Sequence, residues 1–104
     1  MDKQAAIPEI IRLWEDPNGF LVQLRGPMVF NEHLYRKIIE ALSTYYDLLA
    51  DDENINRRVA RFLFDLGITL EGEAYQFLSR QHPDAQKVTN AHAETLALLY
   101  KLLP

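Results

Sequence analysis

Residues 31–50 read NEHLYRKIIEALSTYYDLLA and contain the longest helical pattern of the chain. Their apolar side chains recur at steps of three and four, the spacing that lines one face of an α-helix. These side chains are Tyr35, Ile38, Leu42, Tyr45 and Leu49. Asn31 is of the residue type that caps helix N-termini. The pattern therefore predicts a helix over residues 32–50, which would span about 27 Å, the width of a small domain.

The same periodicity recurs on both sides of this segment. It predicts further helices over residues 5–15, 55–66, 70–81 and from 83 almost to the C-terminus. Asn18-Gly19 ends the first of these, because Asn-Gly is a strong turn pair. Gly67 stands where a glycine commonly follows the last turn of a helix, and Thr69 is a capping residue for the next one.

Residues 20–30 carry a different pattern. Phe20, Val22 and Leu24 alternate with other side chains, as in a β-strand, and Gly26-Pro27 suits a tight turn. This pattern predicts a short β-hairpin or an extended crossover. A lone two-stranded hairpin is marginal in water, so it would have to pack on helices or pair with another chain.

These elements predict a mainly α fold. We expect residues 1–104 to form a single helical domain, a bundle of four to five helices with an optional short hairpin around residues 20–30. A chain of 104 residues with 48% apolar and 25% charged residues is long enough to bury a core, which excludes a disordered or collagen-like chain.

Charge and cysteine content exclude several function classes. The net charge of −4 disfavours nucleic acid and anionic membranes as partners. No apolar run approaches the ~18 residues that span a bilayer, so no membrane partner is expected. The chain has no cysteine, which excludes disulfides and thiolate metal sites. Its start lacks the apolar stretch of a secretory signal, so the cytoplasm is the expected compartment.

An acidic bend at residues 52–56 places oxygen-bearing side chains at the first, third and fifth positions of a calcium-type loop. The sixth position is Arg57 where glycine is required, and the twelfth is Leu63 where a bidentate glutamate is required. We therefore interpret the bend as a helix-capping region and expect no metal site.

Arg57, Arg58 and Arg61 form the densest basic cluster, of a kind that can bind phosphate. We interpret the cluster as a solvated face, because Arg61 and Asp65 have the i, i+4 spacing of an ion pair. The helix–glycine–helix outline around Gly67 resembles a helix-turn-helix. Its second helix begins with Glu71 and Glu73, however, which have the wrong charge for DNA.

The three histidines are His33, His82 and His92, and no two of them have metal-ligand spacing. His92 falls on the apolar stripe of the last helix, where a histidine is usually packed and neutral. It is nevertheless the one candidate for a polar site inside the bundle. No nucleophile motif and no phosphate-binding loop accompanies it, so neither a cofactor nor catalysis is expected.

Aromatic side chains are the remaining signal. Tyr35, Tyr45, Tyr46 and Trp14 combine large apolar area with a polar group, which suits a core rim or an interface. The apolar stripe of residues 32–50 is wider than one neighbouring helix needs, so part of it could dock a second copy or a different protein.

Two functional hypotheses follow. The leading one is a non-catalytic interaction or regulatory protein, such as an adaptor, an inhibitor or an immunity-type antagonist. It would act through a helical, aromatic-rich, acidic surface on a protein partner or by self-association as a homodimer. The alternative is a small-molecule-binding protein or a small enzyme with its polar site at His92. A pocket of at least ~300 Å³ that reaches His92 would favour the alternative.

Overall fold

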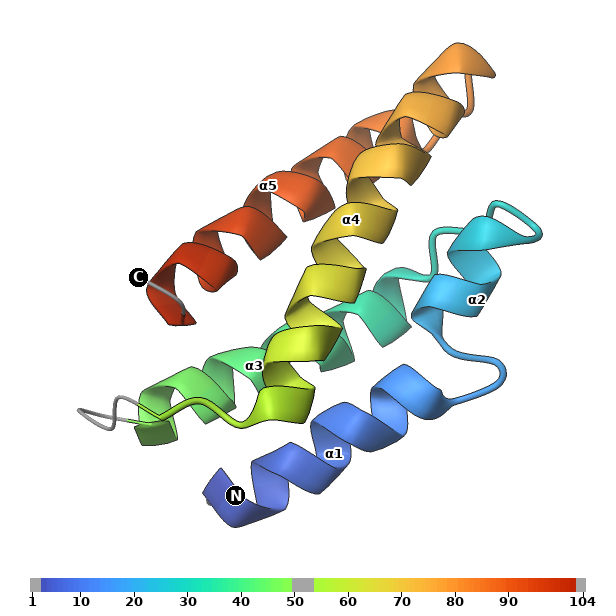
Figure 1. Cartoon of the computed structure of the whole chain (residues 1–104). Coiled ribbons are helices and arrows are strands. Elements are labelled where there is room, and N and C mark those ends of the chain that lie inside the picture. The colour runs from blue at the N-terminus through green and yellow to red at the C-terminus, as the bar shows by residue number, and fades with distance from the viewer. Residues whose placement is uncertain (1–2, 50–53, 103–104) are drawn as a thin grey trace.

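The computed structural model describes residues 3–49 and 54–102 (Figure 1). Its elements are α1 (Lys3–Glu15), α2 (Phe20–Arg25), α3 (Glu32–Leu49), α4 (Arg57–Ser79) and α5 (Ala85–Leu102). The described residues contain no strand, so the prediction of a mainly helical fold is confirmed.

The predicted hairpin is wrong, because residues 20–25 form the short helix α2 instead. Phe20, Leu21 and Leu24 have helical spacing as well as strand-like alternation, and all three are buried. Val22, which the strand pattern would have placed beside Phe20 and Leu24, is 48% exposed. Gly26 ends the helix, and its N–H donates to the carbonyl of Val22. Burial of the i, i+1, i+4 set therefore decides between two patterns that the sequence supports equally.

The helix α4 also differs from expectation, because it continues through Gly67 where two helices were predicted. Gly67 does not have a positive φ, so it does not adopt the left-handed conformation of a C′ glycine. Leu66 and Leu70 lie on either side of it on one buried stripe. Packing of that stripe keeps α4 continuous, at the modest cost that a glycine imposes on a helix interior.

Capping residues define the start of α4. The Asn56 side chain accepts hydrogen bonds from the backbone N–H groups of Arg58 at 2.9 Å and Val59 at 3.2 Å. The capping interpretation of this region is thus supported at Asn56, whereas residues 52 and 53 of the predicted acidic bend lie outside the described part of the chain.

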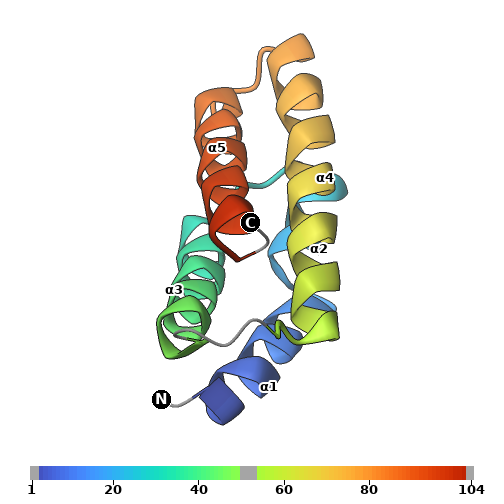
Figure 2. The same ribbon diagram turned by 60° about the vertical axis from the view of Figure 1, so that its left-hand side comes forward.

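The helices pack as two antiparallel pairs (Figures 1 and 2). α4 lies along α5 in the most extensive contact, and α1 lies along α3. Further contacts of α4 with α1 and of α5 with α3 join the pairs, and α2 packs against α1 and α4. The core draws on all of these helices, and its largest fully buried side chains include Tyr35, Tyr45, Phe20, Phe62 and Phe77. Among the residues described, no helix is both long and apolar enough to cross a membrane.

Candidate interaction surface

Tyr35 lies in the core, with 1% of its surface exposed. Its hydroxyl donates a hydrogen bond of 2.6 Å to Oε1 of Glu94 on α5. Arg36 Nη1 lies 3.3 Å from the other carboxylate oxygen of Glu94. Burial raises the pKa of the Tyr35 hydroxyl, and the hydrogen bond to Glu94 raises it further. Tyr35 therefore connects α3 to α5 and is not available to a partner in this conformation.

The other three predicted aromatic residues have different surroundings. Tyr45 is buried, and its hydroxyl accepts a hydrogen bond of 2.9 Å from the backbone N–H of Asn56, just before α4. Trp14 is half-buried and its ring lies against Phe62, with the ring centroids 5.4 Å apart. Tyr46 is 37% exposed, and Nζ of Lys101 lies 5.6 Å from its ring centroid. Of the four, Tyr46 alone has an exposed ring.

Asp65 on α4 connects α1 and α2 to that helix. Its carboxylate accepts a hydrogen bond of 3.0 Å from Trp14 Nε1 and lies 3.2 Å from Arg25 Nη2. The same guanidinium donates to Oγ1 of Thr69 at 2.6 Å. The predicted Arg61–Asp65 ion pair is not formed, because Asp65 points toward α1 and α2.

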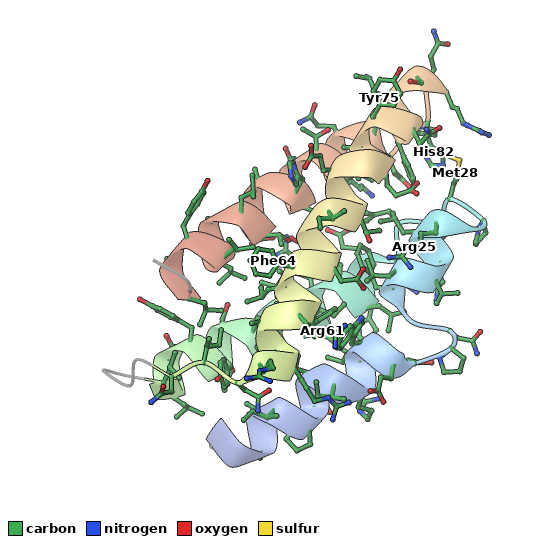
Figure 3. All side chains as sticks on the ribbon, viewed as in Figure 1. Arg25, Met28, Arg61, Phe64, Tyr75 and His82 are labelled. Atoms are coloured by element: carbon green, nitrogen blue, oxygen red, sulfur yellow. The ribbon has the colours of Figure 1, made fainter. Side chains whose placement is uncertain are left out.

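Four of the nine large apolar side chains that are exposed in the described residues lie on α4, and the other five are spread over α2, α3, α5 and the loop before α3. Phe64 is 50% exposed, and Ile68, Tyr75 and Leu78 are each 69% exposed. These four residues have the spacing of one helical stripe, and the stripe lies opposite the buried one that packs in the core. Arg61, Phe64 and Tyr75 follow one another along α4 in Figure 3. Single exposed apolar residues are ordinary, but a row of four along one helix face is of a kind that occurs in interaction surfaces.

An open groove of about 180 Å³ runs beside this stripe, between α4 and α5. It is lined by Phe64, Gly67, Ile68, Glu71, His92, Leu96 and Leu99. A Cβ added at Gly67 would meet nothing within 4 Å, so the glycine leaves open space at the groove. We call the stripe and this groove together the α4–α5 face.

His92 is half-buried and lines this open groove, whereas the sequence predicted a polar site at His92 inside the bundle. The groove is smaller than the ~300 Å³ at which small-molecule sites begin. In the part of the chain that the structure describes, no group of three or more histidine or carboxylate side chains has the arrangement of a metal site.

Charged side chains flank the apolar stripe on α4. Arg57 and Arg61 are exposed near its N-terminal end, and Glu71 is exposed within it. Neither Arg61 nor Glu71 forms an ion pair with any residue in the ranges 3–49 and 54–102. The α4–α5 face therefore presents uncompensated charges of both signs around an apolar centre.

Phe64 and Ile68 are exposed apolar residues that sequence reasoning did not single out. The sequence does contain a pattern that could have indicated them. Steps of four and three residues continue along one helix face through Phe64, Ile68, Glu71, Tyr75 and Leu78. The expected helix break at Gly67 divided that series.

Comparison with protein-family models, with curated proteins and with solved structures finds no significant match to this chain.

Proposed function

We propose that this chain is a non-catalytic protein-interaction module and that the α4–α5 face is its binding surface. The observation that carries the proposal is the stripe of exposed Phe64, Ile68, Tyr75 and Leu78 beside an apolar groove. Complete burial of a large apolar side chain is worth about 1.5–3 kcal/mol. Each of these four side chains keeps half or more of its surface in water, so a partner that covered them would gain several such increments.

The site of this proposal differs from the one that the sequence favoured. Tyr35 and Tyr45 have their hydroxyls bound inside the chain, which leaves Tyr46 as the exposed aromatic residue of α3. The stripe on α4 is longer than the exposed part of α3 and adjoins a groove. For this reason we place the binding surface on α4 and α5.

The chemistry of the groove argues for a protein partner over a small molecule. A small-molecule site normally encloses its ligand and offers a few convergent polar groups. Here His92 and Glu71 are the ionisable side chains of a groove of about 180 Å³ that is open to solvent. An apolar side chain of a partner would fill that volume, as anchor residues do in protein interfaces.

A regulatory role as adaptor, inhibitor or immunity-type antagonist would use the same face. The net charge of −4 would speed association with a basic partner. In that case the association rate should fall as salt is added, whereas a rate that does not respond to salt would remove the basic-partner version.

Photo-cross-linking in cells that make the chain tests the proposed face. A photoreactive phenylalanine analogue at Ile68 should give a protein adduct of one defined mass, and adding Phe64→Asp should abolish it. The matched control places the analogue at Val22, which is also exposed but lies on α2. The absence of an adduct at Ile68, or equal adducts at both positions, would contradict the proposal.

A further inference from the structure

We infer that the α4–α5 face binds a second copy of this chain, with the two α4 helices antiparallel about a two-fold axis near residue 66. This inference rests on the proposed function and names its partner. The residues that carry it are the exposed members of one series on α4, which we call the α4 seam. The α4 seam consists of Arg57, Arg61, Phe64, Ile68, Glu71 and Tyr75.

The spacing of the α4 seam is that of a helix–helix interface. Its members are separated by four, three, four, three and four residues, the pattern by which two helices stay in contact over several turns. From Arg57 to Tyr75 the seam covers about 27 Å of helix. Within this chain the seam has no helix against it, since its members are exposed and the opposite stripe of α4 packs in the core.

Charge complementarity selects a second copy in the antiparallel direction. With the axis near residue 66, Phe64 lies opposite Ile68 of the second copy, and the symmetry repeats this contact. One turn outward, Arg61 lies opposite Glu71 of the second copy, again twice. At the ends, Arg57 lies opposite the Tyr75 ring, where a cation–π contact is favourable. Each seam residue thus meets a complementary one.

A parallel pair would not have this complementarity. It would place Arg57, Arg61 and Glu71 against the same residues of the other copy, so every charged position would meet a like charge. Arg57 and Arg58 also lie in the first turn of α4, where the helix dipole disfavours positive charge. In the antiparallel arrangement the C-terminal half of the other α4 lies beside these arginines. The helix dipole is negative toward that end, so this contact favours the antiparallel direction.

The size of this surface sets the expected strength. A standard interface takes about 800 Å² from each partner, which is about one eighth of the 6333 Å² that this chain exposes. One helical seam with its groove lies at the lower end of that class. We therefore expect a dimer that dissociates on dilution, with two chains related by symmetry.

Sedimentation of the purified full chain over a concentration series tests the inference through charge reversal. Arg61→Glu and Glu71→Arg should each weaken the dimer about tenfold, which is about 1.4 kcal/mol. An equimolar mixture of these two variants should restore it, because each reversed residue then meets an opposite charge. Arg80→Glu and Glu40→Arg are the matched controls, since both residues are exposed and lie off the seam. Circular dichroism verifies that every variant is folded.

A spin label tests the direction of the helices, and the absence of cysteine in the chain makes single-site labelling simple. With Ser79→Cys labelled in both copies, the antiparallel arrangement separates the two positions by about 39 Å along α4. A short separation would indicate parallel helices and would overturn the inference.

Two further results would overturn it: a chain that stays monomeric at every concentration, and a dimer that the mixture of variants does not restore. The proposed function fails separately. If the chain is monomeric but the analogue at Ile68 still gives an adduct with another protein, the inference that the partner is a second copy is wrong. The proposal that the α4–α5 face is a binding surface then still holds. If no adduct forms either, the face itself is wrong.

Discussion

Replacing Gly67 by alanine tests the continuity of α4 by the sign of its effect on stability. If Gly67 ended a helix in the left-handed conformation, a Cβ would be strained there and the substitution would destabilise the fold. The structure places Gly67 inside a continuous helix without a positive φ, and an added Cβ meets nothing within 4 Å. Alanine should then stabilise the chain, because it is the better helix former by about 0.8–1.0 kcal/mol.

Urea denaturation followed by circular dichroism measures this change. The expected result is a higher midpoint with an unchanged slope, since the surface exposed on unfolding does not change. The measurement belongs at a protein concentration below that of any self-association, so that only folding is compared. Gly72→Ala is the matched control, because Gly72 is also helical and its Cβ position is also empty. If Gly67→Ala destabilised the chain while Gly72→Ala stabilised it, α4 would not be continuous at Gly67.

Three other substitutions test two contacts between helices and the N-terminal cap of α4. Tyr35→Phe should cost about 1–2 kcal/mol in urea denaturation, because it removes the hydrogen bond to Glu94. Burial raises the pKa of Tyr35, so its ionisation favours the unfolded chain; stability should fall as pH rises above about 10, and less steeply in Tyr35→Phe. Equal slopes in the two proteins would contradict this. Asp65→Ala should cost about 1–2 kcal/mol, since Trp14 Nε1 then loses its acceptor, and a thermal midpoint equal to that of the native sequence would refute the contact. Asn56→Ala should cost about 1 kcal/mol by loss of the cap, and an unchanged urea midpoint would refute it.

Much of the helical architecture followed from periodicity alone. The segments of α1, α3 and α5 each carry apolar residues at steps of three and four, and no competing pattern covers them. Residues 20–25 are too short for periodicity to decide, because Phe20 and Leu24 are spaced for both a helix and a strand. Only burial in the folded chain distinguishes the helix from the strand in this segment.

Gly67 shows why the exposed stripe of α4 was harder to predict than the helical fold. Sequence reasoning treats a glycine near the end of an apolar run as a helix end. In the structure, packing against α5 continues past it, and α4 then carries a buried stripe and an exposed one along its whole length. The apolar residues of α3 look like a surplus in the sequence, but α1 and α5 cover most of them. Which of two apolar faces is covered depends on how the helices are arranged in space. The local spacing of apolar residues does not show that arrangement.

The mass of the chain in solution, measured by light scattering over a concentration series, tests most directly whether the exposed stripe of α4 binds a second copy of the chain. We expect the mass to rise from that of one 12.1 kDa chain toward that of two, and we expect Ile68→Ser to abolish the rise and Val22→Ser to leave it unchanged. A mass that rises equally in Ile68→Ser and Val22→Ser would contradict this expectation.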